Sequence, residues 1–392
     1  MRVDGVHTVE QVADQMRYLH DHRGPRAHAQ LIGGEVSMLS PDDHAAALLE
    51  MRKNGREPMS MTNGDFDYDY LRDLALGPDG KPRLRRISFA AHFDSLMFGR
   101  RGIARAGTED ELNPYRQRFA KMFSRLRREY GVRSFLAHNM TVTPANVDQI
   151  SDVIRSCRAM GYRMFSFQPA AYVGDERKWR DGYRGVSSDE VWARVEDGVG
   201  CRLPFRALQT GDERCNRTTF GFYVGNRYYP LLDDQDAADL RVRDGIIRYF
   251  GGLNAAAATP YLFAAKVVRI ALAHPVVVPI ALGWATRMIR TIGPWHLLRH
   301  LRIRPVTFVM HSFMDATQVA SAWELLERKE MSADPALREV QERLQACFYT
   351  MGHPESGRLV PACVQHAVLD PEENRQLRKL LPLFPVDKAS SV

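Results

Sequence analysis

Apolar positions over roughly the first 170 residues follow two alternating spacings. Short apolar runs bounded by turn-forming residues have the length and composition of buried strands. Between them, apolar residues recur three and four positions apart, which is typical of helices with one buried face. The predicted strands are 27–32, 58–62, 85–91, 133–138 and 162–167, and the predicted helices are 8–20, 41–53, 67–76, 109–130 and 145–160. This order predicts an α/β fold of parallel β/α units.

Cap residues mark several of these helix starts. Ser40 precedes Pro41, and proline suits the first helical position because its missing N–H would have no partner there. Thr143 and Pro144 repeat this pattern before the helix at 145–160. We therefore expect that helix to begin at Pro144, directly after the strand before it.

The pattern changes after the fifth predicted strand. Gly225 and Asn226 suit the tight turn of a hairpin, and the apolar segment 255–304 is predicted to be helical. We divide the chain into two parts. A partial parallel (β/α) barrel that lacks its first strand covers 1–186, and a mainly helical C-terminal extension covers 187–392.

Polar residues and glycines follow each of the five predicted strands. Parallel β/α units bind ligands at the carboxyl ends of their strands, in barrels and in open sheets alike. We predict that these residues share one rim and bind a cofactor, although turns are rich in Asn, Asp and Gly for structural reasons alone. The candidate residues are Gly33, Gly34, Glu35, Asn63, His92, Asp94, Asn139, Thr141, Asn146 and Gln168.

Two stretches carry most of this prediction. In QLIGGEVSML, residues 30–39, bare glycine backbone lets a ligand approach, and Glu35 can accept hydrogen bonds from an ammonium or hydroxyl group. In LAHNMTVTPANVDQI, residues 136–150, polar residues leave a strand and enter a helix whose N-terminus favours a carboxylate or phosphate. The structural alternatives are a plain turn with a solvated Glu35 and an Asx turn that caps the helix.

These stretches resemble radical S-adenosylmethionine enzymes. In that family GGE follows the second strand of a partial β/α barrel, and an N-x-T-V-T-x-x-N-like stretch lies at the fifth. Here these are Gly33–Glu35 and Asn139–Asn146. MSMTNGDFDYDYL and MGYRMFSFQPAA are similar to the third and sixth strand segments of a subgroup, and the resemblance covers residues 8 to about 175.

The resemblance implies a function and several residue roles. An electron donor reduces a [4Fe-4S] cluster, and the cluster cleaves S-adenosylmethionine reductively. The resulting 5′-deoxyadenosyl radical abstracts hydrogen from a substrate that the sequence does not identify. Gly34 and Glu35 are implied to contact the amino group of S-adenosylmethionine. Asn139 and Thr141 are implied to contact its ribose or carboxylate.

The chain departs from this family in one defining feature. No C-x3-C-x2-C spacing occurs in it, and no strand is predicted before Thr8. Either the sequence begins at an internal methionine, with the cluster ligands expected upstream of residue 1, or it is a degenerate relative that keeps the scaffold. We predict that the chain as given assembles no catalytic cluster. The alternative function is a cluster-less scaffold that binds a nucleotide or a partner.

Four cysteines in the second half are candidate ligands for an auxiliary cluster or zinc, because thiolates suit both. They are Cys201, Cys215, Cys347 and Cys363, of which none lies two to four residues from another. This spacing favours plain buried thiols, and the metal site is the alternative.

Histidines and carboxylates at strand ends also hold the metal of metal-dependent hydrolases. The candidates for this rival function are His92, Asp94, His138 and Asp65. No H-x-H pair lies on a predicted strand, so buried structural roles for both histidines are the alternative.

Composition bears on the size of the core, on the partners and on the cellular compartment of the protein. The chain has 392 residues, 45% of them hydrophobic, which is enough for a substantial core. Its net charge of +7 comes from basic residues spread along the chain without interleaved aromatics, so we expect no nucleic-acid partner. Five widely spaced cysteines and the absence of a charged-then-apolar leader favour a cytoplasmic protein.

The most apolar run, 270–285, is shorter than the ~20 residues that a membrane-spanning helix needs. It contains His274 and two prolines, and basic residues flank it. We expect it to pack in the core or to lie on a membrane as a peripheral contact.

Overall fold

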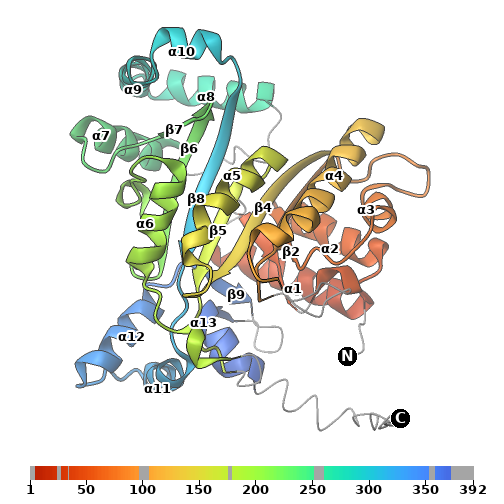
Figure 1. Cartoon of the computed structure of the whole chain (residues 1–392), viewed down its shortest axis with the longest axis vertical. Coiled ribbons are helices and arrows are strands. Elements are labelled where there is room, and N and C mark those ends of the chain that lie inside the picture. The colour runs from red at the N-terminus through yellow and green to blue at the C-terminus, as the bar shows by residue number, and fades with distance from the viewer. Residues whose placement is uncertain are drawn as a thin grey trace.

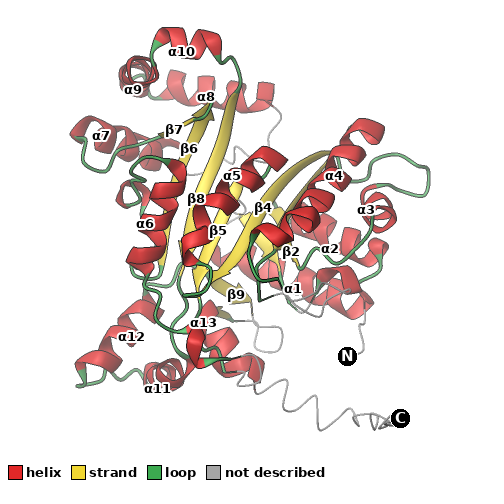
Figure 2. Cartoon of the chain, viewed as in Figure 1, coloured by secondary structure: helices red, strands yellow, loops and turns green. Residues whose placement is uncertain are grey.

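The computed structural model describes residues 5–23, 28–33, 35–96, 106–174, 179–250, 260–352 and 358–371. Its centre is an open eight-stranded sheet with the strand order β1-β2-β3-β4-β5-β8-β6-β7 (Figures 1 and 2). The strands β1 to β5 and β8 are parallel, and β6 is antiparallel to both of its neighbours. The strands are β1 (His28–Leu31), β2 (Glu57–Thr62), β3 (Arg86–His92), β4 (Arg133–Val142), β5 (Met164–Pro169), β6 (Asn216–Val224), β7 (Arg227–Pro230) and β8 (Ile303–His311).

All five predicted strands are present, as β1 to β5 in chain order, and the predicted α/β class with parallel units is confirmed. The sheet does not close on itself, because β1 and β7 form two separate edges. Within the described residues β1 pairs with β2 alone. The structure therefore supports an open, mostly parallel sheet and does not establish a barrel.

Six helices, α1 to α6, contact one another in chain order and form a continuous layer over the sheet. Figure 2 shows α4, α5 and α6 in front of the strands. These helices are α1 (Gly5–Arg23), α2 (Pro41–Lys53), α3 (Tyr68–Ala75), α4 (Asn113–Tyr130), α5 (Ile150–Met160) and α6 (Ser188–Val199). The remaining ones are α7 (Ala237–Gly245), α8 (Pro260–Ala273), α9 (Val277–Ile292), α10 (Pro294–Arg299), α11 (Ala316–Glu327), α12 (Pro335–Gln345) and α13 (Ala362–Val364). A small antiparallel pair, β9 (Thr350–Gly352) and β10 (Leu359–Pro361), lies beside α13.

The main core lies between this helical layer and the sheet. Aromatic rings from both layers meet there, with ring centroids 5.2 Å apart for Phe89 and Phe123 and 4.9 Å apart for Phe119 and Phe123. Offset and tilted aromatic pairs of this kind add to the free energy gained from apolar burial. The helix-facing side of the sheet is thus the apolar side.

Local chemistry sets some helix ends as predicted and one differently. The Ser40 hydroxyl accepts the backbone N–H of Asp43 at 3.1 Å, and α2 begins at Pro41. The helix expected to begin at Pro144 instead begins at Ile150, after a 3-10 turn. The Asn146 side chain accepts the backbone N–H of the residue three positions before it, which turns the chain before the helix can start.

The second half of the chain extends the same sheet. β8 pairs in parallel with β5, and β6 adds to β8 in antiparallel orientation. The predicted hairpin is confirmed as β6 and β7, joined by a turn in which Gly225 has a φ of 61°. The sequence pattern did not indicate β8. The division at 186 stays a prediction, and strands from beyond it complete the sheet.

In the apolar segment 255–304, the described residues form α8, α9 and α10 and, at Ile303, the start of β8. Its helices lie together beyond the end of the sheet at which β8 begins (Figure 1). None of the helices in the described ranges is both long and apolar enough to cross a membrane.

Two buried histidines predict how stability changes with pH. Burial lowers the pKa of His44 and of His311 to about 4. The unfolded chain takes up these protons near pH 6.5, so native stability is fully present above that pH and falls as the pH drops toward 4, by about 1.4 kcal/mol per pH unit for each histidine. In urea unfolding at several pH values, His44→Gln is expected to flatten this slope by one proton. The exposed His22→Gln is the control and leaves the slope unchanged, and an unaltered slope in His44→Gln contradicts the assignment.

Candidate functional site

The strand register places a row of polar side chains at the carboxyl ends of β2 to β5. His92 lies beside Asn139, and Asn139 lies beside Ser166. Asn63 directly follows β2 and reaches the same level. Side chains alternate between the faces of a sheet, and neighbours at one level share a face. These four residues therefore form one polar row.

The polar row lies on the face that is turned away from the main core. Phe89, Leu136 and Phe165 occupy alternate positions on the same strands, and all three pack in the helix-covered core. Within each strand the positions of the two sets differ by an odd number, so the two sets point to opposite faces. The row thus lies on the face of the sheet opposite helices α2 to α6, where Asn139 and Ser166 are buried.

A small apolar floor lies one level below this row. The register brings Met61, Ala90, Ala137 and Met164 side by side. The two central alanines are buried and keep the side-chain volume low in the middle of the sheet. Methionine adapts its shape to a neighbouring group because it is unbranched and polarisable. An apolar floor beneath a few polar groups is the usual composition of a small-molecule site.

The Glu35 carboxylate fastens the end of β1 to the end of β2. Its Oε1 accepts the Thr62 hydroxyl at 2.6 Å and the hydroxyl and backbone N–H of Ser37 at 3.0 and 3.2 Å. Its Oε2 accepts the backbone N–H of Asn63 at 2.6 Å. A carboxylate oxygen has two lone pairs, so Oε2 can accept a further hydrogen bond from a ligand.

Asp94, two residues after His92, holds His92 and the end of β4 in position. Its carboxylate contacts His92 Nε2 and accepts the backbone N–H of Thr141 at 2.8 Å and of Leu96 at 3.0 Å. Burial opposes ionisation of this carboxyl, but His92 and the backbone donors outweigh it and hold the pKa of Asp94 below its usual value. The proton on the His92 imidazole therefore lies on Nε2, and the ring is fixed in orientation.

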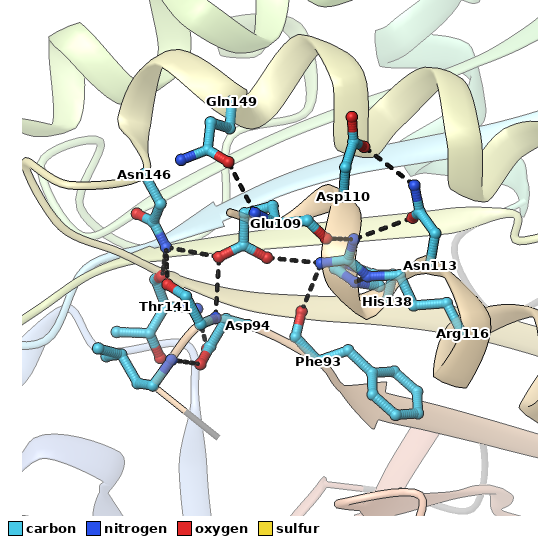
Figure 3. Close-up of polar contacts among 12 residues, drawn as sticks. Phe93, Asp94, Glu109, Asp110, Asn113, Arg116, His138, Thr141, Asn146 and Gln149 are labelled. Carbon is cyan, nitrogen blue, oxygen red and sulfur yellow. Dashed lines mark hydrogen bonds and ion pairs between the residues drawn. The ribbon is translucent and has the colours of Figure 1, made fainter. Parts of the chain in front are cut away.

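A buried carboxylate, Glu109, joins the loop after β3 to the loop after β4 (Figure 3). Its Oε1 accepts the Ser95 backbone N–H and the Asn146 Nδ2, both at 2.9 Å. Its Oε2 lies 2.6 Å from Nη2 of Arg116, and neither side chain of this ion pair is exposed. Asn146 Nδ2 also donates to the Thr141 carbonyl at 3.1 Å. The network thus ties the loop after β3 to the end of β4.

His138 belongs to this network and has a structural role. Arg116 Nε donates to His138 Nε2 at 3.1 Å, while Arg116 Nη2 donates to the Phe93 carbonyl at 3.0 Å. Burial, together with the Arg116 charge, lowers the pKa of His138 well below its usual value. The imidazole is therefore neutral and acts as an acceptor.

The structure does not bring together the two histidines on which the hydrolase interpretation depends. His138 lies beside Ala91 and points into the helix-covered side, whereas His92 is one position further along and points to the opposite face. Across the described ranges no three His, Cys, Asp or Glu side chains are gathered as metal ligands. The two histidines cannot bind one metal ion together.

The four candidate metal-ligand cysteines have protein partners. Arg343 Nε donates to Cys215 Sγ at 3.1 Å, and the Met314 backbone N–H donates to Cys363 Sγ at 3.4 Å. Burial raises the pKa of all four thiols, which favours the neutral thiol over the thiolate that binds metals. The described residues therefore give no support to an auxiliary metal site.

The structure sorts the predicted cofactor-binding residues into two kinds. Gly33, Glu35, Asn63, His92, Asn139, Thr141 and Gln168 all lie at the carboxyl-end rim, where Thr141 is beside Gln168. Asp94 and Asn146 are each 1% exposed, and their polar atoms bind other protein groups. We therefore assign these two a positioning role in place of ligand contact. Gly33 has a φ of 131°, which favours glycine, and Gly34 lies outside the described residues.

Sequence reasoning missed Glu109 and Arg116. Both are charged residues without any exposed surface, and hydropathy places such residues on the outside. The only signal was their separation by seven residues, which places them two turns apart in a helical stretch. A 3-10 turn, Asp110–Leu112, lies between Glu109 and α4, so even that signal is imperfect.

Comparisons with known proteins find little. No family model matches the chain, and no curated protein matches it. A structure of SuiB from Streptococcus suis bound to S-adenosylmethionine is 15% identical, with a TM-score of 0.35 over 49% of this chain and 40% of that one. SuiB bound to the precursor peptide SuiA is 15% identical, with a TM-score of 0.34 over 49% of this chain and 38% of that one. The chain spans well under half the length of these structures, and a likeness at this level carries no functional argument.

The buried ion pair predicts the effect of removing one charge. Glu109→Gln leaves the Arg116 charge without a partner in the interior, and we expect the free energy of unfolding to fall by about 3–5 kcal/mol. The matched control is Glu111→Gln, an exposed carboxylate two residues away, with an expected loss within about 1 kcal/mol. Urea unfolding measures both.

A second variant separates the charge effect from a packing effect. Replacing both partners, Glu109→Gln with Arg116→Met, removes the unpaired charge and is expected to recover part of the lost stability. Equal losses in the single and double variants would contradict the role of the ion pair.

Proposed function

We propose that the carboxyl-end rim of this sheet binds S-adenosylmethionine and that the protein is an enzyme of the radical S-adenosylmethionine kind. The observation that carries this proposal is the polar row at the rim, above the alanine floor and beside Glu35. The stretches that resemble the family, Gly33–Glu35 and Asn139–Asn146, end strands β1 and β4 of one parallel sheet. Their common rim supports a single ligand that contacts both.

Glu35 and Asn139 have the chemistry to bind the methionine part of this ligand. The ammonium group of S-adenosylmethionine is a cation, and Glu35 Oε2 has a lone pair left to accept a charge-assisted hydrogen bond from it. Asn139 and Thr141 both lie on β4, three strands from β1 at the same rim, and offer polar groups for the carboxylate or the ribose hydroxyls. This assignment follows the residue roles that the resemblance implies.

The floor suits the apolar surface of the ligand. Ala90 and Ala137 keep the side-chain volume low in the middle of the floor, and Met61 and Met164 flank them. Thioether side chains pack well against aromatic rings such as adenine. The protein's own part is thus to bind and orient the nucleotide and to keep water away from it.

In the family that the sequence resembles, a reduced [4Fe-4S] cluster supplies the electron that cleaves S-adenosylmethionine into methionine and a 5′-deoxyadenosyl radical, which takes a hydrogen atom from the substrate. Within the described ranges no group of side chains fits such a cluster.

Isothermal titration calorimetry of the chain with S-adenosylmethionine tests the proposal. We expect binding that weakens by about 10- to 100-fold in Glu35→Gln, because the variant loses the negative charge but keeps the size of the side chain. Asn139→Ala is expected to weaken binding by about tenfold. Asn54→Ala is the matched control, since Asn54 lies between α2 and the amino end of β2, at the other end of the strand from the rim, and its side chain bonds to Glu50.

Thermal unfolding of each variant shows that it is folded before binding is measured. A folded wild-type chain that does not bind S-adenosylmethionine contradicts the proposal. Equal affinity for adenosine and S-adenosylmethionine, unaffected by Glu35→Gln, would instead favour the cluster-less scaffold that binds a nucleotide.

A further inference from the structure

The helices α8, α9 and α10 form a segment with an unusual charge. Residues 260–304 contain no Asp or Glu. The cations in this segment are Lys266, Arg269, Arg287, Arg290, Arg299, Arg302 and Arg304. The segment therefore carries a net positive charge, which attracts anions.

The same segment exposes most of the large apolar side chains found at the surface. Of the 20 exposed large hydrophobic residues in the described ranges, 11 lie between Tyr261 and Ile303. Leu272 is 77% exposed, Trp295 83% and Leu301 81%. Scattered apolar residues are normal on a protein surface, but a concentration of this kind marks an interaction site.

The inner side of this segment is anchored to the rest of the protein. Trp284 Nε1 donates to the Leu231 carbonyl at 2.8 Å, and Arg287 pairs with Asp239. Ile292 is buried in a small apolar cluster with residues of β6 and β7. The segment is therefore held in place, and its outer side remains exposed.

Further cations gather at the same edge of the sheet. β8 begins directly after α10, so the exposed Arg304 lies at the amino ends of the parallel strands. Arg163 precedes β5. Burial first, and then the nearby charges of Arg127, Arg304 and Arg86, lower the pKa of Arg163, so Arg163 and Arg304 lie close together. Arg86 contacts Glu57 at 3.6 Å, which offsets one of these charges. The edge as a whole remains basic.

We infer that the outer side of α8 to α10 is a peripheral docking surface for a membrane that contains anionic lipids. Apolar side chains such as Trp295 would enter the boundary between headgroups and acyl chains, while arginines keep their guanidinium groups at the anionic headgroups. The helices lie along the membrane, since none in the described ranges could cross it. A second copy of the chain is a poor occupant, because two acid-free basic faces repel each other.

This surface lies at the opposite edge of the sheet from the rim. α10 leads into the amino end of β8, whereas the polar row lies at the carboxyl ends of β2 to β5. Docking would therefore turn the rim away from the bilayer, toward the aqueous side (Figure 1). The inference holds whether or not the rim binds S-adenosylmethionine.

Co-sedimentation of the full chain with lipid vesicles tests the inference. We expect binding to vesicles of phosphatidylcholine mixed with an equal amount of phosphatidylglycerol, and little binding to phosphatidylcholine alone. High salt is expected to weaken the binding, because it screens the charges of arginines and headgroups. Lipids brominated near the headgroup are expected to quench Trp295 fluorescence, and Trp295→Phe removes that part of the quenching.

Two pairs of matched variants separate the contributions of charge and apolar contact. Arg299→Glu with Arg302→Glu is expected to weaken vesicle binding by at least about 25-fold, at about fivefold per lost cation. The control, Arg118→Glu with Lys121→Glu, changes the same net charge at exposed positions on α4 and leaves most of the binding. Trp295→Ser with Leu301→Ser is expected to weaken vesicle binding in co-sedimentation, whereas Leu49→Ser with Met331→Ser, elsewhere on the surface, leaves the binding unchanged.

Two results would overturn the inference. One is a folded chain that does not sediment with anionic vesicles. The other is a dimer in light scattering that Trp295→Ser with Leu301→Ser converts to a monomer, which would assign the apolar side to a second copy of the chain. Binding that responds equally to the α4 control would show a non-specific charge effect and would also contradict a dedicated surface.

Discussion

The buried ion pair between Glu109 and Arg116 is the constraint on which the rim depends. Charges without contact with water are costly unless each donor and acceptor has a partner. Arg116 therefore also binds the Phe93 carbonyl and His138, and Glu109 also binds Asn146. Satisfying one pair of charges thus fixes the loop after β3, the start of α4 and the end of β4 relative to one another.

Three carboxylates hold the rim in place, and each connects a different pair of elements. Glu35 fastens β1 to β2, Asp94 fastens β3 to β4, and Glu109 fastens the loops on the helical side. Each accepts backbone N–H groups at a strand end, where the sheet itself leaves donors without partners. A rim that is held this way loses little entropy when a ligand binds, which favours affinity and a defined ligand orientation.

The parallel sheet also separates two properties of the surface. Its carboxyl edge carries amides, hydroxyls and an imidazole above small side chains, as a binding site for a polar small molecule requires. Its amino edge, extended by α8 to α10, carries arginines and exposed apolar side chains. Both ends of the strands belong to one rigid sheet. A contact at the amino ends therefore sets the orientation of the rim at the carboxyl ends without touching the rim.

The sequence by itself determined the five strands β1 to β5, the helices between them, the hairpin at Gly225 and the rim on which the candidate residues lie, because apolar spacing and turn residues act over short distances. Only the tertiary structure decided that β8 joins β5, since that pairing spans more than 130 residues of chain with no local signal. It also decided which polar residues face a ligand. Asp94 and Asn146 are polar residues in rim loops, but their side chains point into the protein. Glu109 is buried although it is charged. In each case another protein group offers the hydrogen bonds that water would otherwise supply.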